Sequence, residues 1–326
     1  MNRRAGDLDD FQRRQPAVGL PVAVVYKFFD DQGNYLAAVL TYYAFVAIFP
    51  LLLIGSSILG FVLQGSPELE KEVLSSALRQ FPIVGDQLAA PEGLQGSTGA
   101  VVVGVLTALY GATGLGQAGQ NVIHEIWAVP RNTRPNPFVG RFRSVLLLAA
   151  AGVALLVVAV ATTLASHVEL LGDGPVTRWG LRLGSVLLAA GVLAVMFRLA
   201  TEGRLSVRQA FPGAVLIAVL WELLQIGGGV FVARVVSRVD AVNGVFALVL
   251  GLIAIIYIAA VIAVLGAELN VVRQEKLYPR ALLTPFTDDV ELTPADRRAY
   301  RSYARARRHK GFERVEVSFD DERPDG

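Results

Sequence analysis

Long apolar stretches with almost no charge dominate this sequence and restrict what it can fold into. Hydrophobic residues make up 53% of the 326 positions and charged residues only 18%, whereas a soluble domain carries about 25% charged residues. A helix that crosses a bilayer needs about 20 mostly apolar residues. Six stretches meet this requirement. We therefore predict an all-α integral membrane bundle with spans at about 36–63, 98–120, 144–166, 180–200, 211–233 and 243–269.

The fourth stretch, 180–200, is the weakest of the six because Arg182 and Arg198 stand near its two ends. Both side chains are long enough to reach the membrane interfaces. A buried or re-entrant helix is the alternative for this stretch.

The distribution of Lys and Arg predicts the orientation of the spans. Cytoplasmic segments of membrane proteins carry an excess of these residues. With the N-terminus inside, the inner segments hold 24 basic residues and the outer segments hold 6. We therefore expect both termini in the cytoplasm. Residues 1–15 mix Arg with Asp and are not followed directly by an apolar stretch, so we expect no cleavable signal peptide.

Two segments next to the first span have their own patterns. Residues 1–35 are predicted to form a cytoplasmic arm, with an interfacial helix where apolar residues recur at a spacing of three to four between Val18 and Phe29. In the outer segment 64–97, Ser66 and Pro67 resemble a helix start. They predict a short extracytoplasmic helical hairpin, and a solvated loop with one helix is the alternative.

Residues 271–326 are predicted to form a separate, partly disordered basic tail. Thr293, Pro294 and Asp296 form a helix-start pattern. Seven Lys or Arg residues and no acid lie between Arg297 and Lys310, which favours a helix held against anionic lipids of the inner leaflet. A solvated tail is the alternative. No known reader motif accompanies the basic run, so we expect no nucleic-acid partner.

Three stretches carry a family pattern. The first two are NYLAAVLTYYAFVAIFPLL at 34–52 and LYGATGLGQAGQNVIHEIW at 109–127. The third region holds FPGAVLIAVLWELLQ at 211–225 and NGVFALVLGLIAIIYIAAVIAVLGAELN at 243–270. Together they resemble the YihY/BrkB family of bacterial inner-membrane proteins. The resemblance implies a six-helix inner-membrane fold of undefined activity. One departure is Asn243-Gly244, where the family pattern suggests Tyr-Gly.

Some members of that family carry the label ribonuclease BN, and others are called virulence or serum-resistance factors. The residues argue against a zinc-dependent nuclease, because the chain has no cysteine and its three histidines are scattered at His124, His167 and His309. No GxSxG or HExxH pattern is present. We therefore expect no catalytic residues, no metal and no cofactor.

Polar residues inside the spans are the candidates for function, because an ionisable group there is unfavourable unless it is paired or hydrated. Glu222 lies near the middle of the fifth span, with Gln225 one turn further on. Tyr42 and Tyr43 lie too deep for an interfacial aromatic belt, and Glu222 is a reasonable hydrogen-bond partner for one of them. A structural role as contacts between helices is the alternative for all four.

A second group of polar residues is predicted at the cytoplasmic ends of the spans. We expect Glu268 to pair with Arg198 in an inner polar cluster; ordinary helix caps and interface pairs are the alternative. The remaining members of the inner cluster are Asn34, Gln117, Gln120, Asn121 and Asn270. Elsewhere on the second span, Gly111, Gly114, Gly116 and Gly119 predict close packing.

Two classes of function fit these features. One is a transporter, or a protein that handles lipids or small molecules, with the polar residues binding the substrate. The other is a non-catalytic membrane scaffold or envelope-integrity factor, with the polar residues holding the helices together. The sequence names neither a substrate nor an oligomeric state. A water-accessible cavity that reaches Glu222 would favour transport.

Overall fold

The computed structural model describes residues 3–62, 98–166, 175–201, 204–234, 241–284 and 290–319. Regular structure in these residues is helical, with no strand among them, as the sequence predicts. The predicted hairpin at 64–97 lies outside the described residues. The helices are α1 (Arg3–Arg14), α2 (Pro16–Asp30), α3 (Gly33–Val62), α6 (Thr98–Ile126), the 3₁₀ turn η1 (Arg131–Thr133), α7 (Pro137–Ser166), α8 (Pro175–Ala200), α9 (Val207–Arg234), α10 (Ala241–Gln274) and α11 (Pro294–Ala306).

Four helices are long and apolar enough to cross a membrane within the described part of the chain: Phe138–Val158 of α7, Gly180–Ala200 of α8, Val207–Gly228 of α9 and Val249–Gln274 of α10. The helices α3 and α6, with 30 and 29 residues, coincide with the first two predicted spans. Their crossing of the membrane stays a prediction.

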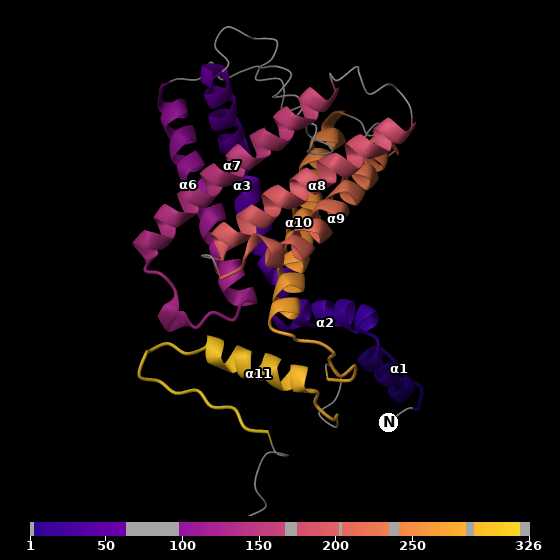
Figure 1. The fold of residues 1–326 in the computed structure, drawn as a ribbon. Helices are drawn as coiled ribbons and strands as arrows, with labels where there is room; N and C mark the ends of the chain where they lie inside the picture. The colour runs from indigo at the N-terminus through magenta and orange to yellow at the C-terminus, as the bar shows by residue number, and fades with distance from the viewer. Residues whose placement is uncertain are drawn as a thin grey trace, which may run out of the picture.

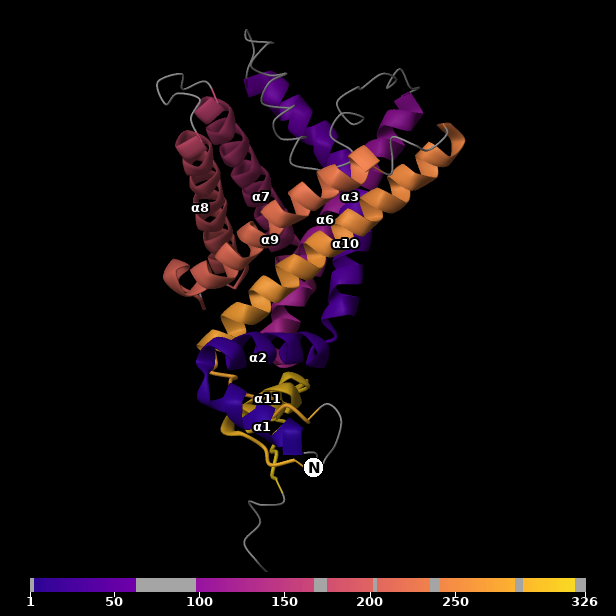
Figure 2. The ribbon, with the colours of Figure 1, turned by 90° about the vertical axis from the view of Figure 1, so that its right-hand side faces the viewer.

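The six long helices form a ring of neighbours in the order α3, α6, α7, α8, α9, α10, with α10 returning to α3. Helix α2 lies across one end of this ring and contacts α10 and α3, and α1 and α11 lie beyond it (Figures 1 and 2). The N-terminal arm and the tail are both at this end, which we call the cytoplasmic end after the orientation that the basic residues predict.

Glycines permit the closest helix contacts, as predicted for the second span. A Cβ on Gly111 would lie 3.1–3.2 Å from Val46 and Ala47 of α3, and a Cβ on Gly114 would overlap the Tyr43 ring. A Cβ on Gly116 would overlap Ser144 of α7. Gly119 has no such role, because an added Cβ there would meet nothing within 4 Å.

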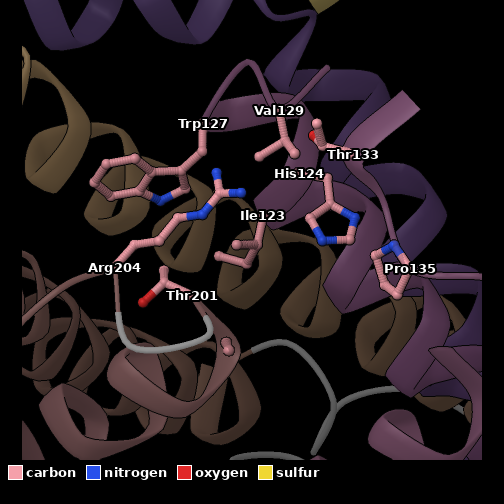
Figure 3. Close-up of a pocket in the computed structure, with 9 residues that line it drawn as sticks. Ile123, His124, Trp127, Val129, Thr133, Pro135, Thr201 and Arg204 are labelled. Atoms are coloured by element: carbon pink, nitrogen blue, oxygen red, sulfur yellow. The ribbon is translucent and has the colours of Figure 1, made fainter. Parts of the chain in front are cut away.

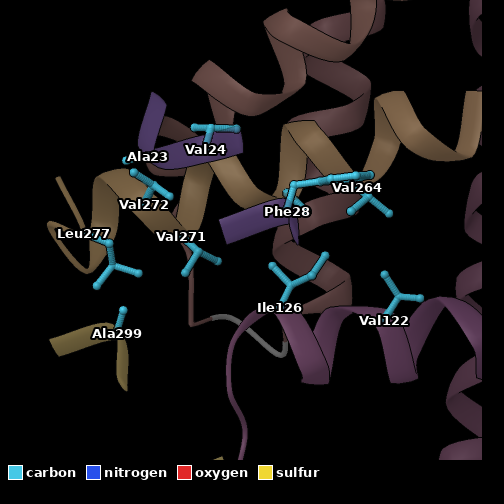
Figure 4. Close-up of a cluster of buried hydrophobic side chains, with 11 residues drawn as sticks. Ala23, Val24, Phe28, Val122, Ile126, Val264, Val271, Val272, Leu277 and Ala299 are labelled. Atoms are coloured by element: carbon cyan, nitrogen blue, oxygen red, sulfur yellow. The ribbon is translucent and has the colours of Figure 1, made fainter. Parts of the chain in front are cut away.

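The main hydrophobic cluster lies at the cytoplasmic end and joins segments far apart in sequence (Figure 4). Phe28 of α2, Ile126 of α6 and Val272 of α10 are buried in it together with Ala299 of α11. We expected the tail as a separate unit beginning at residue 271. That boundary stays a prediction, but the tail helix shares its core with the bundle.

Helix α11 begins as predicted. The Thr293 hydroxyl accepts a hydrogen bond from the backbone N–H of Asp296, and the Asp296 carboxylate accepts one from the backbone N–H of Thr293. This reciprocal capping box satisfies donors that a helix start leaves free. The helix ends at Ala306, four residues before the predicted end at Lys310.

Candidate functional site

A cavity of about 600 Å³ lies at the cytoplasmic end, between the start of α3, the last turns of α6 and helix α11. Ligand sites commonly measure about 300–1,000 Å³. Side chains of both charges line this cavity together with polar and aromatic groups. The lining is Asp30, Asp31, Gln32, Tyr35, Leu36, Val39, Tyr43, Gly114, Gln117, Ala118, Asn121, Val122, Glu125, Ala128, Arg131, Arg134, Tyr303, Ala306 and Arg307.

The cavity runs up between α3 and α6. Asp31 and Arg131 lie at its cytoplasmic end, and Tyr43 and Gly114 line it further along the two helices. Tyr43 is ten residues after Gly33, which corresponds to about 15 Å of helix. For comparison, a hydrocarbon core is about 30 Å thick.

Three of the residues singled out in the sequence line this cavity: Gln117, Asn121 and Tyr43. Asn34 and Tyr42 lie on the same part of α3 with exposed side chains, outside the lining. The other predicted site residues lie on other helices, with Arg198 on α8, Glu222 and Gln225 on α9, and Glu268 and Asn270 on α10.

The expected pair between Glu268 and Arg198 is wrong. Arg198 is exposed on α8, and α9 lies between α8 and α10 in the ring. Glu268 is completely buried, and its Oε2 lies 3.3 Å from the Nζ atom of Lys27. Lys27 reaches Glu268 because α2 crosses beneath the end of α10.

Lys27 is the centre of a buried charge cluster. Its Nζ donates to the carboxylate of Asp31, four residues on, and to the backbone carbonyl of Ile126 at 2.9 Å. The ring of Tyr303 lies over the ammonium group at 5.5 Å. Lys27 is 1% exposed and Asp31 is 8% exposed. This cluster was not predicted from the sequence. The i,i+4 spacing of Lys27 and Asp31 near the end of an apolar helix is the sequence signal that could have indicated it.

Burial alone would lower the pKa of Lys27, but the carboxylates of Glu268 and Asp31 outweigh burial and hold that pKa above its ordinary value. Burial raises the pKa of Asp31, and the nearby Lys27 ammonium offsets only part of this effect. The cluster thus keeps Lys27 charged and makes Asp31 easier to protonate than an ordinary aspartate.

A second group of paired charges borders the cavity, which Asp30 and Tyr303 line. The Arg280 guanidinium pairs with the buried Asp296 carboxylate and lies 3.1 Å from Asp30. The Tyr303 hydroxyl donates to Asp30 at 3.2 Å. Burial and the carboxylates of Asp31 and Asp30 raise the pKa of Tyr303, so this hydroxyl stays a donor. These contacts attach α11 to α2.

The opposite wall holds arginines. Arg134 forms a salt bridge of 3.1 Å with Glu125, and the Arg131 guanidinium lies 3.3 Å from the His309 ring. The backbone N–H of Asn132 donates to the carbonyl of Arg308 at 3.2 Å. The segment after α11 is therefore tied to the loop after α6, and the tail spans the cytoplasmic side of the cavity.

Asn270 has a structural role in place of the expected membership of the inner cluster. Its Oδ1 accepts a hydrogen bond of 2.9 Å from the backbone N–H of Gly213, and its Nδ2 donates to the carbonyl of Ala210 at 3.2 Å. A Cβ on Gly213 would lie 2.1 Å from the carbonyl oxygen of Gly266. Asn270 thus links α10 to α9 where the two backbones nearly touch.

The expected hydrogen bond between the tyrosine pair and Glu222 is not formed in the described structure. The Tyr42 and Tyr43 rings pack edge-to-face at 5.1 Å, and Tyr43 turns toward Gly114 of α6. Glu222 is half-buried on α9. The tyrosines face the α6 side of α3, and α10 lies between α3 and α9 in the ring, so the groups do not meet.

A second, much smaller cavity lies where the end of α6 meets the turn after α8 (Figure 3). Its volume of about 10 Å³ leaves room for about one water molecule. His124, Trp127, Thr201 and Arg204 are among its lining residues. Its size excludes a larger ligand.

Within the described residues, no group of three or more His, Cys, Asp or Glu side chains is placed to hold a metal ion.

Comparison with known protein families identifies the family of the chain. The profile of the family described as virulence factor BrkB matches residues 24–288. No solved structure gives a significant match.

The curated relatives are described as UPF0761 membrane proteins. The protein of Alkalilimnicola ehrlichii is 27% identical over 260 residues, which cover 77% of this chain and 57% of the relative. The protein of Halorhodospira halophila is 28% identical over 284 residues, which cover 82% of this chain and 61% of the relative. The chain thus spans about three fifths of these relatives. The predicted family resemblance is confirmed: the chain is a membrane protein of the BrkB family.

Proposed function

We propose that this chain is a six-span protein of the bacterial inner membrane, with both termini in the cytoplasm, that takes up a small polar or amphipathic molecule in its cytoplasmic cavity. The proposal includes no catalytic step. It extends to transport or lipid handling, because the cavity runs up between α3 and α6, which are the first two predicted spans. The observation that carries it is the 600 Å³ cavity itself, with charges of both signs and with Gln117, Asn121 and Tyr43 in its lining.

The lining favours a ligand with both polar and apolar parts. Carboxylates and guanidinium groups stand at the cytoplasmic end, whereas Leu36, Val39 and Ala118 line the cavity further up. Such a surface suits a molecule with a charged end and an apolar body. Anionic lipid at the exposed arginines of α11 remains part of the proposal, with no nucleic-acid partner.

A scaffold is the second candidate, and specific contacts favour it. Gln120 donates to the Gly140 carbonyl and to the Ser144 hydroxyl, and Asn270 links α10 to α9. Polar groups used in this way hold membrane helices together. They lie outside the cavity lining, so the two candidates rest on different residues.

Native mass spectrometry of the gently extracted full-length protein separates these candidates. The wild type is compared with Gln117→Trp, which fills the cavity, and with Leu146→Trp, which adds the same bulk on the exposed face of α7. We expect a bound molecule to be retained by the wild type and by Leu146→Trp and to be lost from Gln117→Trp. A wild type without bound molecules, or equal retention by all three proteins, would favour the scaffold.

A further inference from the structure

The buried cluster beside the cavity has an excess of negative charge. Asp31 and Glu268 supply two carboxyl groups, and Lys27 supplies one ammonium group. With all three ionised, a net negative charge would remain in a site where Glu268 is 0% exposed. An uncompensated buried charge is strongly unfavourable. The cluster therefore requires one more positive charge.

The hydrogen-bond geometry indicates where this charge belongs. The Asp31 and Glu268 carboxylates both lie against the Nζ atom of Lys27, so the two carboxyl groups are close neighbours. As carboxylates they are acceptors only. Neither oxygen of Glu268 accepts a well-aligned hydrogen bond in the described structure, although Lys27 Nζ lies 3.3 Å from Oε2. A single proton on either carboxyl group would supply the missing donor and would neutralise the cluster.

The space around the cluster favours a proton over a metal cation. Lys27 Nζ already lies among three oxygen atoms, from Asp31, Glu268 and the Ile126 carbonyl. Neither cavity described above includes Glu268 in its lining. A bare metal ion would have to displace the ammonium group, whereas a proton needs no additional volume.

Asp31 gives the cluster access to water. Of the three charged residues in the cluster, Asp31 lines the cytoplasmic cavity, whereas Glu268 is completely buried outside the lining. We propose that Asp31 and Glu268 form a proton-binding site that holds one proton between their carboxyl groups, with Lys27 as the fixed counter-charge, and that exchanges this proton with the cavity through Asp31. On loading, a hydronium ion in the cavity transfers its proton to a carboxylate oxygen and leaves as water; release is the reverse.

The neighbouring groups are compatible with this role. Arg280 pairs with both Asp30 and Asp296, and Tyr303 donates to Asp30, so these four residues form a separate set at the edge of the cluster. The raised pKa of Asp31 has a defined consequence for stability. Because folding raises this pKa, protonation of Asp31 stabilises the folded state. This stabilisation is complete below the ordinary pKa of 3.8 and is lost as the pH rises through the raised pKa.

Infrared difference spectroscopy of the full-length protein in lipid nanodiscs tests this site. The pH is stepped between about 5 and about 9, a range that brackets a carboxyl group with a raised pKa. We expect the wild type to show the C=O band of a buried, protonated carboxyl group at neutral pH and to lose it at high pH. Asp31→Asn and Glu268→Gln each leave one carboxylate beside one ammonium group. These two charges balance without an added proton, so each substitution should abolish the band. Glu125→Gln, which changes a cavity carboxylate paired with Arg134, should keep it.

A wild type without this band, or a band that persists in both cluster variants, would overturn the proposal. A cluster stabilised by added Na⁺ rather than by protons would overturn it as well. The wild-type titration is decisive even if a variant fails to fold. Coupling of this proton to uptake of a solute rests on the proposed function. The infrared readout needs no solute, so the proton site and the transport proposal can fail separately.

Discussion

The cytoplasmic end of the bundle and the middle of α9 both hold acidic residues, but these residues differ in burial and in their charged neighbours. Glu268 is completely buried and lies beside Lys27, whereas Glu222 is half-buried on α9, next to the exposed Leu223. The difference arises from segments outside the spans. Helix α2 brings Lys27 to Glu268, and α11 covers the ammonium group with Tyr303. Burial of an acid is tolerated where such a segment delivers a cation.

Removal of the buried cation should have the largest effect on stability. Lys27→Met keeps most of the side-chain volume but leaves Asp31 and Glu268 without their counter-charge. We expect a loss of about 3–5 kcal/mol in the free energy of unfolding, the usual result of breaking a buried pair. Equilibrium unfolding in mixed micelles measures this loss. Adding Glu268→Gln to Lys27→Met should restore part of it; a single variant within about 1 kcal/mol of the wild type would contradict the cluster's importance.

Asn270 tests the uncharged contact at the same end. Asn270→Ala removes both hydrogen bonds to α9 and leaves the Gly213 N–H unpaired. We expect about 1–2 kcal/mol of destabilisation in the same assay. Gln225→Ala on the half-buried flank of α9 is the matched control, with a smaller expected effect. Equal effects of the two changes would show that the Asn270 link adds no stability of its own.

The capping box of α11 should give a smaller and more local effect. Thr293→Ala removes the hydroxyl that accepts from Asp296, and loss of such a cap costs about 1 kcal/mol. We expect faster amide hydrogen exchange across 294–306, with little change in the six long helices. Ser302→Ala removes a hydroxyl from the same helix away from the cap. Equal exchange in the two variants would argue that the capping box does not hold α11.

Glu222 should give the smallest effect. Glu222→Gln preserves shape and hydrogen-bonding capacity at a half-buried position, so we expect a change in unfolding free energy within about 0.5 kcal/mol. The same unfolding assay measures it. A loss as large as that of Lys27→Met would show that the middle of α9 holds an interaction as strong as the cytoplasmic cluster.

Local patterns predicted the helices well. Apolar length located α3 and α6 to α10, and Thr293, Pro294 and Asp296 predicted the start of α11. These features depend on residues that are neighbours in sequence. Hydropathy and capping therefore contain the information needed to place them.

The partners of the polar residues could not be predicted in the same way. Arg198 and Lys27 were both basic residues near the cytoplasmic ends of helices, and the sequence did not reveal that α2 crosses beneath α10 while α9 separates α8 from it. Arg280 and Tyr303 were missed because their contacts with Asp30 join positions 250 and 273 residues apart. Such contacts depend on the arrangement of helices rather than on spacing.

Solvent access at single introduced cysteines tests most directly whether the cytoplasmic cavity, rather than the middle of α9, is the functional opening. The natural chain has no cysteine, so each variant carries one thiol and no background. Gln117→Cys and Glu222→Cys are treated in inside-out membrane vesicles with a membrane-impermeant maleimide. We predict rapid labelling of Gln117→Cys and little labelling of Glu222→Cys, because the cavity includes the first position and not the second. Rapid labelling at Glu222→Cys with none at Gln117→Cys would contradict this account and place the opening in the middle of α9.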